Sequence, residues 1–182
     1  MRAESTTTMK TDRKTIFSED RVHHYTLWRD WDVDSLTGCA DDLPRHDQYL
    51  NVIGLNPSTA DEKLDDNTIR RCINFAKTWG FGAFCMTNLF AFRSTKPDGM
   101  RQAENPVGQD NDHHIRRIAS SAGMVLCAWG NNGVWRNQDL NVMKALKECG
   151  VKPYCLRITK MKQPEHPLYM PKDSQPIPFE IK

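Results

Sequence analysis

The sequence predicts an α/β protein, a three-layer α/β/α sandwich around a mostly parallel central sheet. Short apolar runs that suit buried strands alternate along the chain with segments of helical periodicity. This alternation is typical of parallel sheets whose strands are joined by helices. The clearest strand pattern, residues 49–55, is apolar and rich in β-branched side chains, and Asn56 and Pro57 end it. Proline donates no backbone hydrogen bond, so the chain must turn there.

The length and the N-terminal composition define the expected domain organisation. A chain of 182 residues fits one domain with a buried core of its own. Residues 1–20 are polar and show no sustained period, so we expect a flexible N-terminal arm. Residues 21–182 are then expected to form the single α/β domain.

Strand and helix patterns alternate through this domain. Strands are recognised by alternating or continuous apolar runs, helices by apolar side chains every three to four residues, and glycine or proline ends most of them. The expected elements are, in order, an edge strand at 22–31, a loop at 32–48, a strand at 49–55, a helix at 61–79, a strand at 83–92, a loop to 108, a helix at 110–121, a strand at 123–129, a helix at 134–148, a strand at 153–158 and a loop at 159–171.

The start of the first helix is marked by candidate capping residues. Ser58 or Thr59 can cap the helix, and Thr59 and Glu62 have the spacing of a capping box. A strand end, a tight loop and a helix N-terminus together hold polar groups over the carboxyl edge of the sheet. Open α/β proteins bind their ligands at this edge.

Composition narrows the functional classes. A net charge of +2 and a pI near 8.2 permit nucleic-acid binding. No apolar run is long enough to cross a membrane and no secretory signal pattern is present, so we expect a cytoplasmic protein, and a monomer. The six cysteines contain no Cys-x-x-Cys pair, so we expect buried free thiols, no metal site and no cofactor.

Polar residues follow each expected strand and meet at one edge of the predicted sheet. The resulting cleft is rich in amides and contains one histidine. Amides donate and accept at once, which suits reading the edge of a nucleic-acid base, and a histidine can donate to an oxygen that gains charge. Phe90 offers a face for stacking. The polar residues are Asn56, Ser58, Thr59 and Asp61, then Asn88 and Arg93, then Asn131 and Asn132, then Thr159, Lys160 and His166.

Two overlapping sets of ordered motifs run through the sequence. The first set is residues 56–61, 66–71, 88–91, 128–130 and 166–169, and the second is residues 54–58, 87–89 and 166–168. Most of the chain, from Tyr25 to Met170, resembles a bacterial and phage family labelled only as a domain of unknown function (number 1643). The layout also resembles, more remotely, the uracil-DNA glycosylase superfamily, especially its mismatch-specific branch with Gly-x-Asn-Pro-Gly. The first set of motifs carries the resemblance to the family of unknown function, and the second set carries the resemblance to the glycosylases.

The glycosylase resemblance implies a role for each matching residue. Asn56 matches the asparagine that positions the attacking water, and Asn88 matches the one that reads the target base. His166 matches the histidine that stabilises charge on the departing base. Leu168, or else Tyr169 or Met170, stands where a wedge fills the gap left by a flipped base.

Two positions depart from the glycosylase pattern. Ser58 replaces the second glycine of Gly-x-Asn-Pro-Gly, and Leu168 stands where many members have serine. The acidic stretch after Ser58, with Asp61 and Asp66, has no counterpart in that motif. One of these two carboxylates is expected to share in activating the water or to recognise a hydroxyl-bearing substrate.

These observations predict a monofunctional DNA glycosylase that needs no metal and acts on double-stranded DNA with one base flipped out. The base is uracil, a mismatched thymine or an enlarged pyrimidine such as glucosylated hydroxymethylcytosine, which would link the protein to defence against phage. An enzyme acting on free nucleotides or nucleosides and a non-catalytic reader of modified DNA remain the alternatives. Ser58, Thr59, Asp66, Asn88 and Phe90 are expected to bind the substrate. The expected DNA contacts are Arg70, Arg71, Arg93, Lys160, Lys162, Leu168 and Tyr169.

Overall fold

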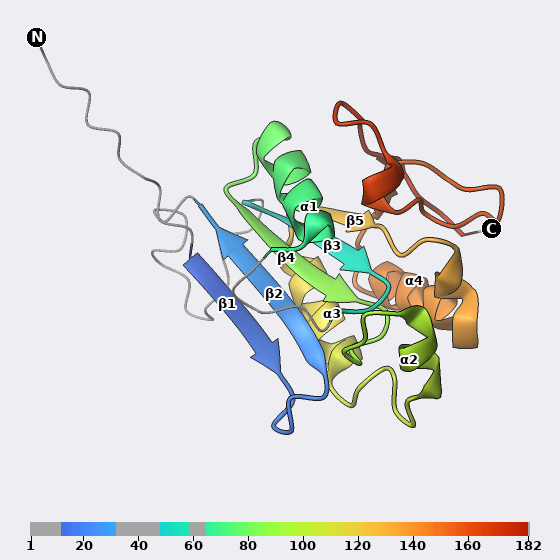
Figure 1. Cartoon of the computed structure of the whole chain (residues 1–182). Helices are drawn as coiled ribbons and strands as arrows, with labels where there is room; N and C mark the ends of the chain where they lie inside the picture. The colour runs from blue at the N-terminus through green and yellow to red at the C-terminus, as the bar shows by residue number, and fades with distance from the viewer. Residues whose placement is uncertain (1–11, 32–47, 59–64, 182) are drawn as a thin grey trace, which may run out of the picture.

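The computed structural model describes residues 12–31, 48–58 and 65–181 (Figure 1). They form an α/β fold around one seven-stranded sheet. The elements are β1 (Asp12–Phe17), β2 (His24–Asp30), β3 (Tyr49–Gly54), α1 (Asn67–Thr78), β4 (Ala83–Asn88), α2 (Pro97–Gln102), α3 (Asn111–Ser121), β5 (Met124–Cys127), the 3₁₀ segment η2 (Asn131–Asn137), α4 (Gln138–Glu148), β6 (Tyr154–Cys155), the 3₁₀ turn η3 (Pro167–Tyr169) and β7 (Ile177–Pro178).

The sheet is mixed, with strand order β1-β2-β4-β3-β5-β6-β7. Its four central strands, β4, β3, β5 and β6, run parallel, whereas β1, β2 and β7 join by antiparallel pairing. The prediction of a mostly parallel sheet therefore holds only for the centre, because the N-terminal hairpin and the C-terminal return add antiparallel strands at both sides. From β3 the chain passes to β4 on one side and later to β5 on the other, so the strand order reverses at β3.

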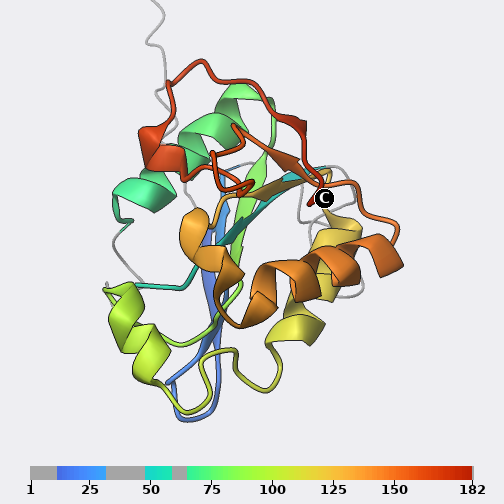
Figure 2. The same cartoon turned by 90° about the vertical axis from the view of Figure 1, so that its right-hand side faces the viewer.

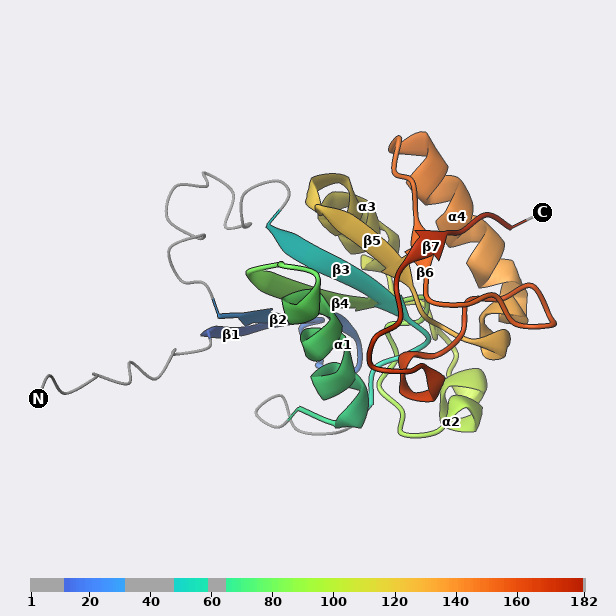
Figure 3. The same cartoon turned by 90° about the horizontal axis from the view of Figure 1, so that it is seen from above.

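Helices cover both faces of the sheet. Figure 3 shows α1 on one face and α3 and α4 on the opposite face. Successive residues of a strand point to opposite faces. Val52 packs with Phe75 of α1, whereas the next residue, Ile53, packs with Ile115 of α3 and Val142 of α4.

The predicted N-terminal arm is partly wrong. Residues 12–17 form β1, which pairs antiparallel with β2 through a register that sets Lys14 opposite Trp28. Because β1 takes the outer position, β2 is not the predicted edge strand, and all seven of its residues are buried. The remaining residues of the predicted arm that precede β1 lie outside the described part of the chain.

Most other expected elements are present as the predicted helix or strand, but their bounds differ from the prediction. The strands at β3, β4 and β5 and the helices α1, α3 and α4 are present, but α1 begins at Asn67 rather than near residue 61, with Asp66 as its cap. The capping box at Thr59 and the loop predicted at 32–48, except Gln48, lie outside the described residues. The long loop after β4 contains α2, which the sequence did not predict, and β6 has only two residues.

The structure also bears on the expectations about membranes and cysteines. No helix in the described ranges combines the length and the apolar character that crossing a bilayer requires. The five cysteines in the described ranges are free thiols: Cys149 is half-buried, and Cys72, Cys85, Cys127 and Cys155 are buried. Burial raises the pKa of the Cys72 thiol to about 12, which keeps it protonated and unreactive at neutral pH.

Candidate functional site

A cleft opens at the carboxyl ends of the central parallel strands, where the strand order reverses. Its volume is about 610 Å³, which lies within the range of cavities that hold small organic ligands. Three segments supply most of its lining: residues 54–58 after β3, 128–132 after β5, and 165–169 around η3. Figure 2 shows η3 beside α1, and Arg71 of α1 joins the two by donating to the backbone oxygen of Met170 at 2.9 Å.

Asn56 lies two residues after the end of β3, with its amide held in one orientation. Its Nδ2 donates to the backbone oxygens of Ser94 at 2.7 Å and Pro57 at 3.1 Å. Only the nitrogen end of an amide can donate, so these two acceptors fix which end is which. The Oδ1 atom is left as an acceptor, and Asn56 therefore offers a fixed hydrogen-bond acceptor to a molecule in the cleft.

Asn88 ends β4 in the floor of the cleft and is 5% exposed. The parallel register places it beside Gly54 of β3. A Cβ at position 54 would stand 2.7 Å from Asn88 Oδ1, so only glycine leaves room for this amide. Asn111 anchors the backbone by donating to the Asn88 carbonyl oxygen at 2.9 Å. Within the described chain the Asn88 side-chain amide has no hydrogen-bond partner, so both its ends are available to a ligand.

His166, in the segment before η3, lines the same cleft as Asn56 and Asn88. Its Nδ1 accepts from the Leu168 backbone N–H at 3.3 Å, so the proton of the neutral ring lies on Nε2. Burial lowers the pKa of His166 below its usual range, and the charges of Asp66 and Glu165 oppose this shift only in part. The ring is therefore neutral at pH 7 and presents an N–H donor.

Asp66 and Ser58 border the cleft at the N-terminus of α1. Asp66 Oδ1 accepts from the Ile69 backbone N–H at 2.8 Å, and the hydroxyl of Ser58 donates to Oδ2 at 3.4 Å. Asp66 therefore replaces the predicted caps, Ser58 and Thr59, because it places a carboxylate oxygen on the free N–H of the first turn. The predicted residues Thr59 and Asp61 lie outside the described residues.

Leu168 and Tyr169 form an exposed apolar rim at the mouth of the cleft. Leu168 is 41% and Tyr169 is 73% exposed. The Tyr169 ring lies 5.8 Å from the His166 ring, centroid to centroid. Exposed apolar side chains beside a polar cleft are the kind of feature that contacts a partner molecule, so both remain candidates for the wedge.

Phe90 does not line the cleft, and its prediction as a stacking residue is wrong. The side chain is fully buried on the face covered by α3 and α4, where its ring lies 5.1 Å from that of Trp135. Asn88 ends β4 with its side chain on the α1 side, and Phe90, two residues later, has left the strand. The period of two that the sequence pattern assumed no longer applies there.

The predicted basic contacts divide into exposed and structurally engaged side chains. Arg70, Lys160 and Lys162 are exposed. Arg71 is bonded to the Met170 carbonyl oxygen, and Arg93 contacts the carbonyl oxygen of Arg21 at 3.4 Å, away from the cleft. Among the described residues, no lysine or arginine lines the cleft itself. Any binding of phosphates by these residues therefore takes place at the rim.

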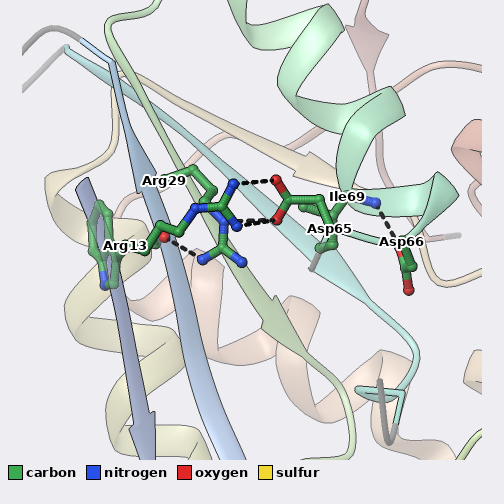
Figure 4. A network of polar contacts seen from close by, with 6 residues as sticks. Arg13, Arg29, Asp65, Asp66 and Ile69 are labelled. Carbon is green, nitrogen blue, oxygen red and sulfur yellow. Dashed lines mark hydrogen bonds and ion pairs between the residues drawn. The ribbon is translucent and has the colours of Figure 1, made fainter. Parts of the chain in front are cut away.

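An ion-pair network fixes the chain where it enters α1 (Figure 4). Arg29 of β2, which is 0% exposed, donates from Nε to Asp65 at 2.7 Å, and Arg13 of β1 lies 3.3 Å from the same carboxylate. The next residue, Asp66, turns its carboxylate toward Ile69 and the helix end. Strands β1 and β2 thus hold the segment that brings Asp66 to the cleft.

Sequence reasoning missed several residues that build the site. Asn111 resembles an ordinary residue of a first helical turn, and Ser94 acts through its backbone oxygen, which no side-chain pattern reveals. Arg101 of α2, which no sequence pattern singled out, donates to the predicted cleft residue Asn132 at 2.9 Å, so α2 supports the wall after β5. His24 lies in the floor, where burial lowers its pKa to about 4. Within the described residues no group of three or more His, Cys, Asp or Glu side chains is arranged to hold a metal ion.

The fold and the site define the molecule as an α/β protein with a ligand cleft at the switch point of its parallel strands. Residues 24–168 match the family model described as protein of unknown function (DUF1643). The chain belongs to this family, as its ordered motifs predict. No curated protein and no solved structure matches the chain significantly.

Proposed function

We propose that this protein is a monofunctional DNA glycosylase that hydrolyses the N-glycosidic bond of a flipped pyrimidine and leaves an abasic site. We also propose that its fold is of the uracil-DNA glycosylase type and that it acts as a monomer in the cytoplasm. One observation carries the proposal: Asn56, Asn88 and His166, from three distant segments, line one cleft with the hydrogen-bonding groups that this reaction requires.

The reaction needs a positioned water and a donor for the leaving base. In hydrolysis the water oxygen bonds to C1′ while the C1′–N bond breaks and its electron pair moves onto the base. Asn56 supplies Oδ1 to orient the water. A carboxylate such as Asp66 stabilises the positive charge that develops on the sugar, or accepts the proton that the water loses when it bonds to C1′. His166 donates from Nε2 to the base oxygen that gains negative charge. A neutral donor suits this role, because the proton stays on the ring.

Base recognition is assigned to the buried amide of Asn88. An amide pairs a donor with an acceptor, which matches the adjacent donor and acceptor groups on the edge of a pyrimidine. Because no neighbouring side chain occupies this amide within the described chain, a base can bind it without breaking an internal hydrogen bond. Leu168 or Tyr169 fills the gap in the duplex, and Arg70, Lys160 and Lys162 bind phosphates at the rim.

The size of the cleft favours an enlarged substrate. A volume of about 610 Å³ accommodates a molecule larger than a bare base. We therefore propose a substituted pyrimidine, such as glucosylated hydroxymethylcytosine, ahead of uracil and mismatched thymine. Removal of many such bases would leave abasic sites throughout phage DNA, and in this way the protein would defend its host against phage.

The test is an excision assay in the presence of EDTA. Purified protein is incubated with duplexes that carry uracil, mismatched thymine, hydroxymethylcytosine or glucosylated hydroxymethylcytosine, and alkali then breaks the strand at abasic sites. We expect breaks in one duplex with wild-type protein and none with Asn56→Ala. Tight binding without breaks would favour a reader of modified DNA, and equal cutting of modified and plain DNA would overturn the substrate assignment.

A second candidate is a hydrolase of free nucleosides. The described lining of the cleft holds no lysine or arginine, so a nucleoside without phosphates fits it better than a nucleotide does. Salt separates the two candidates, because DNA binding weakens steeply as salt rises and nucleoside binding does not. Turnover of free nucleosides that is independent of salt would favour this second function.

A further inference from the structure

We propose that a buried hydrogen-bond chain from Trp129 through Gln163 to Asp139 positions His166 for catalysis. The inference rests on the proposed function in that it assigns His166 a catalytic task, but the contacts stand independently of it. Gln163 is thus a positioning residue, since it acts through the segment that carries His166 and does not itself line the cleft.

The chain of hydrogen bonds joins three parts of the fold. Trp129, after β5, donates from Nε1 to Gln163 Oε1 at 2.8 Å. Gln163 donates in turn from Nε2 to Asp139 Oδ2 at 2.9 Å. Asp139, in the first turn of α4, also accepts from the Leu140 backbone N–H at 2.9 Å. The sheet edge, the segment before His166 and α4 are thereby tied together.

All three side chains are removed from solvent. Trp129 is 2%, Gln163 3% and Asp139 4% exposed. An indole only donates and a carboxylate only accepts, so the residue between them must offer an acceptor on one side and a donor on the other. The amide of glutamine meets both demands. Leaving either neighbour unpaired in the interior would destabilise this arrangement, because a buried polar group needs a partner.

The backbone carries this constraint from Gln163 to His166. Gly130 donates to the carbonyl oxygen of Pro164 at 2.9 Å, and Glu165 donates to that of Arg157 at 2.8 Å. Each residue between Gln163 and His166 is therefore bonded to a different neighbouring segment. Gly130 has φ +70, a conformation that favours glycine, and this turn brings its N–H to Pro164.

The hairpin that precedes Gln163 is solvated at its tip and is held at its base both by Thr159, whose hydroxyl donates to Asn131 Oδ1 at 2.7 Å, and by Gln163. Residues 159–162 form a tight turn with exposed Met161 at its tip, closed by a bond from the Thr159 N–H to the Gln163 carbonyl oxygen at 2.8 Å. Lys162 has φ +63, which is unfavourable for a non-glycine residue. A solvated turn with such a backbone needs an anchor, and the only fully buried polar side chain of the described segment 157–170 is Gln163.

A polarity swap tests the hydrogen-bond chain without changing its shape. Gln163→Glu places a second carboxylate beside Asp139, removes the donor and should displace the segment. Adding Asp139→Asn restores the second hydrogen bond with reversed polarity, because the new asparagine donates to the new glutamate, while Trp129 donates to position 163 as before. We expect Gln163→Glu to lower kcat about 10- to 100-fold with KM near that of the wild type, and the double variant to recover most of it.

The control carries the same chemical change elsewhere. Gln175→Glu adds one carboxylate at an exposed position in the C-terminal segment and should leave kcat unchanged. Circular dichroism and the thermal midpoint identify any variant that merely unfolds. If Gln163→Glu fails to fold, Trp129→Phe removes one hydrogen bond of the chain while keeping a ring, and we expect it to show the same loss of kcat at a smaller scale.

A second measurement does not depend on catalysis. NMR titration of the His166 ring reports its surroundings, and Gln163→Glu should move the His166 pKa toward its usual value as the segment leaves its buried place, with reversal in the double variant. An unchanged His166 titration in folded Gln163→Glu, or no recovery in the double variant, would overturn the proposal. A wild type that excises no base, with the titration behaving as expected, would instead count against the glycosylase.

Discussion

Asn88 and Phe90 are separated by one residue, yet they belong to two different parts of the molecule. Asn88 faces the cleft with an amide that no described side chain engages. Phe90 is sealed in the core beside Trp135 on the opposite face. The end of a parallel strand thus separates function from packing: one face keeps hydrogen-bonding capacity free, and the other is filled by aromatic side chains.

The same division runs across the neighbouring strands. On the cleft side, Asn56 and His166 each use one end of the side chain to bond the backbone and keep the other for a ligand. On the α3 and α4 side, Ile53 and Cys127 pack without access to solvent. Substitutions on the cleft side should therefore lower activity with little loss of stability. Substitutions on the α3 and α4 side should lower stability.

The largest contrast in stability is expected between Phe90→Ala and Asn88→Ala. Truncating a fully buried phenylalanine should lower the free energy of unfolding by about 3–5 kcal/mol. Asn88→Ala should change it by less than about 1 kcal/mol, because the lost amide has no partner to abandon, while substrate binding and excision fall. Urea denaturation measures the free energy of unfolding of both variants. Equal destabilisation would contradict the proposal that the cleft side serves function and the opposite side serves stability.

Asn56→Ala is expected to have the largest effect on rate within the cleft. Loss of the group that orients the water should slow excision about 10²- to 10³-fold, the scale typical of removing one preorganised polar group. DNA affinity should stay near that of the wild type, since the phosphate contacts are untouched. Single-turnover kinetics with a parallel binding titration distinguish the two effects, and a variant that loses affinity but keeps its rate would assign Asn56 to binding.

Acid should destabilise the cleft floor through His24. Burial is the main reason that its pKa falls from 6.5 to about 4, and the charges of Arg93, Arg29 and Arg21 add to the shift. Between these two values the unfolded chain binds the proton and the folded chain does not, so stability present above pH 6.5 is lost as pH falls toward 4. The expected loss is up to about 3 kcal/mol.

His24→Gln provides the matched comparison, because glutamine stays neutral and can still donate to the Thr26 carbonyl oxygen that His24 contacts at 3.2 Å. Its urea midpoint should fall less than that of the wild type between about pH 7 and about pH 4.5, the window set by the lowered pKa. Parallel pH dependence of the two proteins would show that other groups dominate the acid sensitivity.

The ion-pair network at the entry to α1 should have the smallest effect of the four. Asp65→Asn removes the carboxylate that Arg29 Nε contacts at 2.7 Å and should cost about 2 kcal/mol, less than breaking a fully buried pair because Asp65 is 14% exposed. Asp98→Asn, whose pairing with Arg101 is exposed at 3.4 Å, serves as the control and should be nearly neutral. Thermal unfolding compares them, and equal midpoints would show that Arg29 finds another partner.

The sequence was sufficient to predict the central strands, the covering helices and the convergence of Asn56, Asn88 and His166 on one edge. These follow from local periodicity and from the rule that carboxyl ends of parallel strands meet. It was not sufficient for β1, because the polar residues 12–14 show no strand pattern and the strand is defined by its antiparallel pairing with β2. The bounds of the two-residue strands β6 and β7 cannot be predicted from local sequence either, because these strands are defined by pairing between distant segments.

Other parts of the site depend on contacts that no local pattern encodes. Ser94 holds Asn56 through a carbonyl oxygen, and Gln163 is buried only because Trp129 and Asp139 meet it from other elements. Phe90 was placed by continuing a strand that ends at Asn88. Local residue types thus predicted which side chains carry chemistry, while tertiary contacts decide how each is held.

The most direct test of the proposed chemistry is to identify what leaves the DNA. A duplex with one glucosylated hydroxymethylcytosine is incubated with wild-type protein, Asn56→Ala and His166→Ala, and mass spectrometry measures the released base against abasic sites on the strand. We predict equal amounts of free modified base and abasic site for the wild type, and neither for the two variants. Release of a sugar or a nucleotide in place of the base, or unchanged base release by Asn56→Ala, would contradict the proposed glycosylase activity.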